Sequence, residues 1–85
     1  MQTFQHIIKD EVGLHARPAG MLVKLASSCS SDISITFESK KVSAKKLFAV
    51  MGLCAKRNDE ITITVEGENE EADCLQIKEF CEQNL

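Results

Sequence analysis

The sequence predicts one α+β domain, in which helices cover one face of a mostly antiparallel sheet. Two patterns predict it: short runs of alternating apolar and polar residues, and between them longer stretches whose apolar residues are three and four positions apart. A chain of 85 residues has room for one hydrophobic core. We therefore expect residues 1–85 to form a single domain.

Two strands follow from strict alternation. Over residues 33–38, apolar residues alternate with serine, threonine and glutamate, and over residues 61–66 they alternate with threonines and a glutamate. Such runs are typical of strands with one buried face. The polar side of both strands predicts that one face of the sheet is open to water.

Two further strands are less regular. Residues 4–8 place a phenylalanine, a histidine and an isoleucine at alternate positions, which predicts an inward-facing side. We expect His6 there to be a strand residue with a hydrogen-bonded ring and no chemical role. Residues 40–43 predict a short strand that a turn joins to the strand at 33–38.

Three helices are expected. Over residues 16–28 apolar side chains share one face, and Gly20 in the middle predicts a close backbone contact, because glycine otherwise weakens a helix. Residues 47–54 predict a short helix that is apolar almost all round and cannot bury every side. Residues 70–84 predict a third helix, whose early acidic residues suit the positive end of the helix dipole, with Asn69 as its N-cap.

Charge and aromatic content argue against nucleic-acid binding. Residues 1–58 carry nine Lys or Arg and four Asp or Glu, a net charge of +5. Residues 59–85 carry one Lys and nine Asp or Glu, a net charge of −8. Six of the ten basic residues lie within residues 40–57. The chain has no Trp or Tyr to stack on bases, however, and its net charge is −3.

The cysteines argue against a metal or redox site, and the apolar stretches argue against a membrane span. No C-x-x-C pair occurs and no cysteine is close in sequence to a histidine, so neither a metal site nor a redox site is expected. We expect all four to be small buried or half-buried apolar residues of a cytoplasmic protein: Cys29, Cys54, Cys74 and Cys81. The longest apolar stretch, residues 47–55, is far below the ~20 residues that span a bilayer, and no export signal is recognisable at the N-terminus.

The stretch GLHARPA, residues 13–19, carries the chemistry that we expect. Its glycine allows a tight turn and its proline is tolerated only in the first turn of a helix, so a helix begins near Ala16. His15 then lies at the N-cap, beside the unpaired backbone N–H groups of Ala16 and Arg17. The Arg17 guanidinium can bind two phosphate oxygens at once. The sequence therefore predicts an anion site beside a nucleophilic imidazole.

The expected charge of His15 suits phosphoryl transfer. The start of a helix and Arg17 both disfavour a positive charge on the ring, so we expect a neutral imidazole whose lone pair can attack phosphorus. The site must hold the phosphoryl group only loosely, since a group bound too tightly would not be passed on. Paired carboxylates, a Ser–His–Asp set and a phosphate loop are absent, so we expect a substrate of other proteins and not an enzyme.

The same stretch resembles the phosphorylation-site signature of HPr, the histidine-containing phosphocarrier family of the bacterial sugar phosphotransferase system. The resemblance covers the whole chain and continues through residues 41–42, 47–51 and 59–63. It implies an open-faced β-sandwich, a four-stranded antiparallel sheet with three helices on one face in the order βαββαβα.

The resemblance also implies the function. His15 would accept a phosphoryl group at Nδ1 from phosphorylated enzyme I and pass it to sugar-specific IIA components, with phosphoenolpyruvate as the ultimate source. Arg17 and the amides of Ala16 and Arg17 would hold the phosphate, without a metal or cofactor. The protein would be a monomer that docks briefly on its partners through an interface of less than ~1,200 Å² in total. The apolar centre of this interface would be Met21, Leu47, Phe48 and Met51, and its rim would be Lys24, Lys45 and Lys46.

Three departures from the family are visible. Many relatives have, at the position of Lys46, a serine that caps the second helix and is phosphorylated by a regulatory kinase, so we expect this chain to escape that control. Ser43 could cap the helix one turn earlier. Val12 stands where relatives are often polar and Cys54 where glycine is common, and both bear on the ends of helices.

Two other functions stay open at this point. The first is a phosphohistidine relay for regulation, of the nitrogen-branch or catabolite-control type, which only its partners would distinguish from a sugar-transport carrier. The second is an interaction module whose basic segment, residues 40–57, binds an acidic protein or nucleic acid while His15 is inert.

Overall fold

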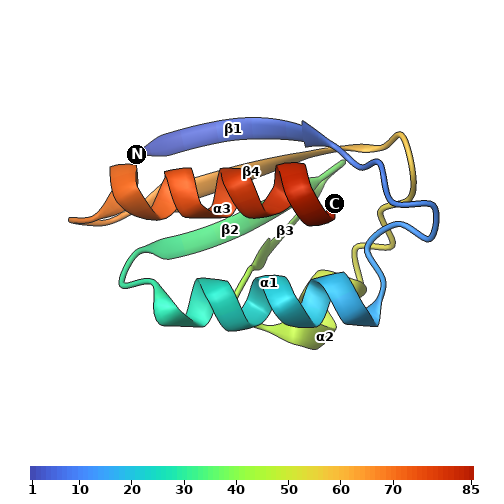
Figure 1. The fold of residues 1–85 in the computed structure, drawn as a ribbon, viewed down its shortest axis with the longest axis horizontal. Coiled ribbons are helices and arrows are strands. Elements are labelled where there is room, and N and C mark those ends of the chain that lie inside the picture. The colour runs from blue at the N-terminus through green and yellow to red at the C-terminus, as the bar shows by residue number, and fades with distance from the viewer.

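The computed structural model describes all 85 residues as an open-faced β-sandwich. Its elements are β1 (Gln2–Ile7), α1 (Ala16–Ser28), β2 (Asp32–Phe37), β3 (Lys40–Ser43), α2 (Leu47–Met51), β4 (Glu60–Glu66) and α3 (Glu70–Asn84). The four strands are all antiparallel, in the order β1-β4-β2-β3. Helix α3 packs on β1 and β4, with α1 beside it and α2 against α1 and β3 (Figure 1). The predicted fold class is confirmed.

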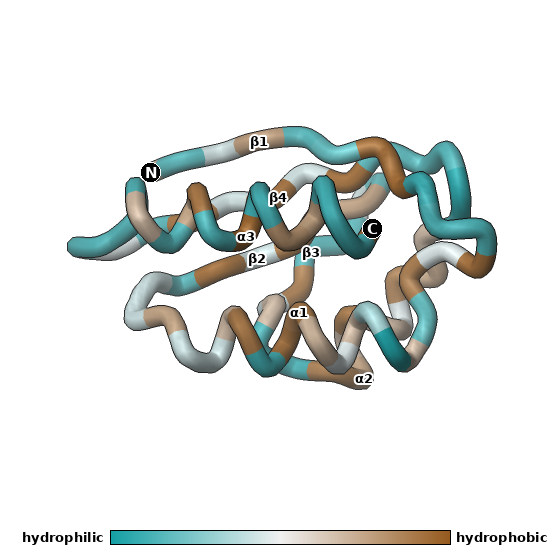
Figure 2. Tube along the Cα trace, in the orientation of Figure 1, coloured by the Kyte–Doolittle hydropathy of each residue, from teal (hydrophilic) through white to brown (hydrophobic).

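The core lies between the sheet and the two long helices. The alternating residues of β2 and β4 point their apolar side chains into it, as the sequence predicts, and α1 and α3 each contribute one face. Figure 2 shows hydrophobic and hydrophilic segments alternating along both long helices, as expected for helices with one buried side. The fully buried side chains include Leu22, Ile35, Ile61, Ile63, Val65, Ile77 and Cys81.

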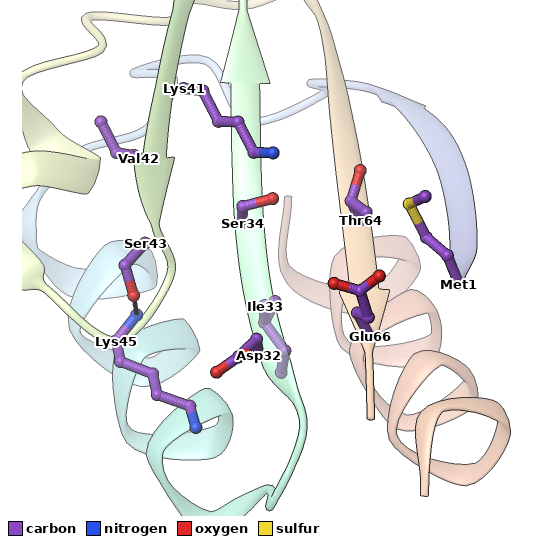
Figure 3. A pocket seen from close by; sticks show the side chains of 10 residues that line it. All are labelled: Met1, Asp32, Ile33, Ser34, Lys41, Val42, Ser43, Lys45, Thr64 and Glu66. Carbon is purple, nitrogen blue, oxygen red and sulfur yellow. Dashed lines mark hydrogen bonds between the residues drawn. The ribbon is translucent and has the colours of Figure 1, made fainter. Parts of the chain in front are cut away.

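The far face of the sheet is open to water. Ser34 and Thr64 are opposite each other on β2 and β4 and both are partly exposed. They line a broad, shallow hollow together with Lys41 of β3, and Asp32 and Glu66 lie at its end (Figure 3). The polar faces of the strands therefore predict the open side correctly.

Two local predictions are wrong, and a third is right in position only. Helix α2 ends at Met51 and not at residue 54, because Cys54 adopts a left-handed conformation with φ 57°. A Cβ at Gly20 would meet no atom within 4 Å, so no close contact explains this glycine. Asn69 is at the N-cap of α3, but its side-chain amide donates to Oγ of Ser30 (3.1 Å) and does not cap the helix.

The cysteines and His6 also differ in part from expectation. All four cysteines are free; Cys29 and Cys81 are buried and Cys74 is half-buried, but Cys54 is exposed. His6 faces the core as predicted, yet Nε2 of its ring has no hydrogen-bond partner in the chain. Burial lowers the pKa of the His6 ring from its ordinary value. None of the helices combines the length and the apolar character that crossing a membrane requires.

Candidate functional site

Gly13 fixes the loop that leads into α1. Its φ is +79°, and a Cβ there would lie 2.6 Å from the carbonyl oxygen of Ala55 and 2.8 Å from Cα of Lys56. Only glycine fits so close to the neighbouring backbone. The next residue, Leu14, is buried and its N–H donates to the same Ala55 oxygen at 3.0 Å. The loop is therefore anchored just before His15.

His15 is the N-cap of α1, as the sequence predicts. Its backbone is extended (φ −94°, ψ −179°) and its carbonyl oxygen accepts the N–H of Ala19 at 3.0 Å. The imidazole makes no capping hydrogen bond and is 34% exposed. The N–H groups of Ala16 and Arg17 donate to no group within the chain. Two backbone donors are thus free beside a partly exposed imidazole.

Arg17 is exposed and forms no ion pair. It lines a shallow hollow that also contains His15 and Met21. By contrast, the guanidinium of Arg57 lies 3.9 Å from a carboxylate oxygen of Glu11. Because no carboxylate occupies it, the Arg17 guanidinium is available to an incoming anion.

Asp10 also belongs to this hollow, and the sequence did not predict it. Its Oδ1 lies 3.5 Å from Nε2 of His15 and accepts the N–H of Val12 at 2.9 Å. This carboxylate is a negative charge beside the ring that the sequence did not lead us to expect. An aspartate bonding the N–H two residues later is a recognised turn pattern, and this was the available signal.

The end of α3 forms the remaining wall of the hollow, through Gln83 and Asn84. Figure 1 shows why: α3 ends at the same end of the molecule at which α1 begins. No sequence pattern marks these two residues, because their proximity to His15 arises only from the packing of the helices.

The apolar residues expected to bind partners divide into two groups. Phe48 is 85% exposed and Met21 is 45% exposed, on helices α2 and α1, which are in contact. Leu47 and Met51 are half-buried and pack against the core. An exposed phenylalanine on a five-residue helix has no structural role in the core, so Phe48 is a strong candidate for a contact residue.

The lysines are placed differently from one another. Lys24 and Lys46 are exposed. Nζ of Lys45 donates to the carbonyl oxygen of Cys29 at 3.2 Å, beyond the far end of α1 from His15. Lys46 is at the N-cap of α2 without a capping bond, and Oγ of Ser43 accepts the N–H of Lys45 at 3.2 Å. Ser43 thus stabilises the turn before α2 and does not cap its first turn.

The comparisons with known proteins identify the family. Residues 2–83 match the family model described as the PTS HPr component phosphorylation site. The chain belongs to the HPr family. It is 42% identical over 79 residues to the phosphocarrier protein HPr of Mycoplasma capricolum subsp. capricolum, an alignment that covers 93% of this chain and 89% of the relative. It is therefore a phosphocarrier of the phosphotransferase system and not an enzyme.

Solved HPr structures share the fold. HPr-C-His from Thermoanaerobacter tengcongensis matches with a TM-score of 0.93 and 33% identity, covering 99% of this chain and 94% of that one. A structure described as an HPr dimer from the same organism matches with a TM-score of 0.77 and 34% identity, covering 98% and 95%. The resemblance seen in the sequence is confirmed at the level of family and fold.

Proposed function

We propose that His15 accepts a phosphoryl group from phosphorylated enzyme I and passes it to sugar-specific IIA components, with phosphoenolpyruvate as the ultimate donor. One observation carries the proposal. A partly exposed imidazole stands at the start of α1 beside two free N–H groups and a guanidinium without a partner. The HPr family supplies the rest of the argument.

The transfer is a displacement at phosphorus. The lone pair on Nδ1 of His15 forms the new N–P bond while the bond from phosphorus to the donor breaks and returns its electron pair to the donor group. The amides of Ala16 and Arg17 and the Arg17 guanidinium bind the phosphoryl oxygens. The same steps in reverse, with a IIA component as acceptor, release the group. A partly exposed site suits this exchange because it stabilises neither state strongly.

Docking is proposed to use the surface formed by Met21 and Phe48, with Leu47 and Met51 supporting it from below. Lys24 and Lys46 stand at its rim, where they would steer partners with an acidic surface. Lys45, which is bonded to Cys29, is expected to contribute least. We propose a monomer in the cytoplasm, with which four free thiols are compatible.

Intact mass after incubation with enzyme I and phosphoenolpyruvate tests the proposal. One acid-labile phosphate is expected on the wild type and none on His15→Ala. Arg17→Ala is expected to slow transfer, whereas the matched variant Arg57→Ala, which removes an exposed arginine outside the hollow, is expected to leave the rate unchanged. Labile phosphate on His15→Ala would contradict the proposal, and an unchanged rate in Arg17→Ala would contradict the role of the guanidinium.

Lys46 makes a second proposal possible. A serine kinase that acts at this position in relatives finds no hydroxyl here, and the Ser43 hydroxyl accepts a hydrogen bond from the backbone. We expect no stable phosphoserine after incubation with such a kinase and ATP. Detection of one by peptide mapping would show that another serine has taken over this control.

A further inference from the structure

The hollow beside His15 contains a single carboxylate, that of Asp10. We propose that Asp10 is a positioning residue for phosphoryl transfer: its carboxylate, 3.5 Å from Nε2 of His15, favours the ring proton on that nitrogen and so leaves Nδ1 as the nucleophile. This inference rests on the proposed function of His15 and adds a residue that determines which ring nitrogen reacts.

Asp10 is held firmly for this role. Its Oδ1 accepts the N–H of Val12 at 2.9 Å and lies 3.5 Å from Nε2 of His15. Its own N–H donates to a main-chain oxygen of Leu85, the last residue of the structure, at 3.2 Å, and its carbonyl oxygen accepts the N–H of Gly13 at 3.0 Å. Main chain and side chain are therefore both fixed, and the carboxylate keeps its direction toward the ring.

The pairing decides the tautomer. A neutral imidazole carries one N–H, and an ionised carboxylate can only accept, so the proton is on Nε2 when that atom faces Asp10. The lone pair is then on Nδ1. The other groups of the hollow do not compete for this N–H as charged acceptors: Arg17 is a donor only, and Gln83 and Asn84 are uncharged.

The same contact assists release of the phosphoryl group. When the N–P bond forms at Nδ1, the ring keeps its proton on Nε2 and gains a positive charge, which the Asp10 carboxylate stabilises. Breaking the N–P bond returns the electron pair to Nδ1 and restores a neutral ring. Because the ring leaves without having to gain a proton, transfer to the next protein stays easy. Nε2 and Nδ1 point to different sides of the ring, so the carboxylate does not occupy the place of the phosphoryl group.

The variant Asp10→Ala tests this, because it removes Oδ1, the atom that faces Nε2 of His15 and accepts the N–H of Val12. Asp10→Asn would leave an oxygen acceptor in the same place. The matched control is Glu11→Gln, which removes one negative charge from the next, exposed residue without contacting His15. We would measure the ¹⁵N chemical shifts of the His15 ring, which report the tautomer, and the rate of phosphorylation by enzyme I. Amide spectra of each variant check that the fold is intact.

In Asp10→Ala we expect a smaller Nε2–H population and transfer slowed by about two- to five-fold, the range of a partly exposed ion pair. Glu11→Gln is expected to match the wild type in the ring shifts of His15 and in the rate of phosphorylation. Unchanged ring shifts in Asp10→Ala, or equal slowing by Asp10→Ala and Glu11→Gln, would overturn the inference. Wild-type phosphate found on a residue other than His15 would instead overturn the proposed function, so the two failures are distinguishable.

Discussion

The starts of α1 and α3 are at opposite ends of the molecule (Figure 1) and differ in charge. Their N-cap backbones differ too, since His15 is extended (ψ −179°) and Asn69 is not (ψ 25°). Both leave N–H groups of the first turn without acceptors: Ala16 and Arg17 in α1, Glu71 and Ala72 in α3. The first turn of α3 contains three acidic residues, whereas that of α1 contains none. Free amides are therefore common to both, and the side chains decide what each helix start does.

The acidic side chains of α3 serve the fold. Oε1 of Glu70 accepts the N–H of Gly67 at 3.3 Å, and Oδ2 of the buried Asp73 accepts the N–H of Ser31 at 3.1 Å. These carboxylates place negative charge from within the chain at the positive end of α3, although they accept N–H groups outside its first turn. The start of α1 carries an imidazole and a guanidinium instead of acids. The partial positive charge of its free N–H groups is therefore available to an external anion.

Placing an acid at the start of α1 is expected to have the largest effect. Ala16 is exposed, so Ala16→Glu fits sterically and gives α1 the charge of α3. We expect phosphorylation by enzyme I to slow about a hundredfold, since unit charges 4 Å apart repel by ~1 kcal/mol in water and ~4 kcal/mol near a protein surface. Initial rates of phosphate transfer measure it. Ala16→Gln is the uncharged control, and an equal loss in both variants would show that shape and not charge is responsible.

Removing the buried acid of α3 is expected to affect stability alone. Asp73→Ala leaves the Ser31 N–H buried without an acceptor, which costs about 1–3 kcal/mol in the free energy of unfolding. Glu71→Ala, an exposed acid of the same turn, is the control and should change it by less than about 0.5 kcal/mol. Urea denaturation measures both. Slower phosphorylation of the folded Asp73→Ala protein would contradict the separation of the two helix starts.

The contribution of Asp73 also has a defined pH dependence. Ser31, through its side chain and its N–H, lowers the pKa of the Asp73 carboxyl below its ordinary value of 3.8, so the folded chain binds this proton more weakly than the unfolded chain does. The stabilisation is complete above the unfolded pKa and is lost as the pH falls through the folded one. Denaturation at pH 6 and pH 3 should therefore show a smaller difference between wild type and Asp73→Ala at the lower pH.

The smallest expected effect concerns the loop near the start of α1. Cys54 has a φ of 57°, which favours glycine, and it directly precedes the residues on which Gly13 packs. Cys54→Gly should stabilise the protein by about 0.5–1 kcal/mol in urea denaturation, without changing phosphoryl transfer. Cys54→Ala keeps the strained conformation and is the control. Equal stability of the two variants would show that the left-handed backbone is not the cause.

The sequence predicted those features that local patterns determine. The start of α1 at Ala16 follows from the glycine and proline around it, and the strands follow from alternation. Asp73 was missed because an acid in a helix is ordinarily exposed, and only the fold brings it to Ser31. The early end of α2 was missed because Cys54 is not a residue type that signals a left-handed backbone. At the site, His15 and Arg17 could be inferred from sequence, whereas the contact of Asp10 needed coordinates.

The most direct test of the central claim is the amide NMR spectrum before and after phosphorylation by enzyme I and phosphoenolpyruvate. We predict large shifts for the N–H groups of Ala16 and Arg17, which would bind the phosphoryl oxygens on His15. The equally free N–H groups of Glu71 and Ala72 should not move. Shifts confined to other parts of the chain, or equal at both helix starts, would contradict the account.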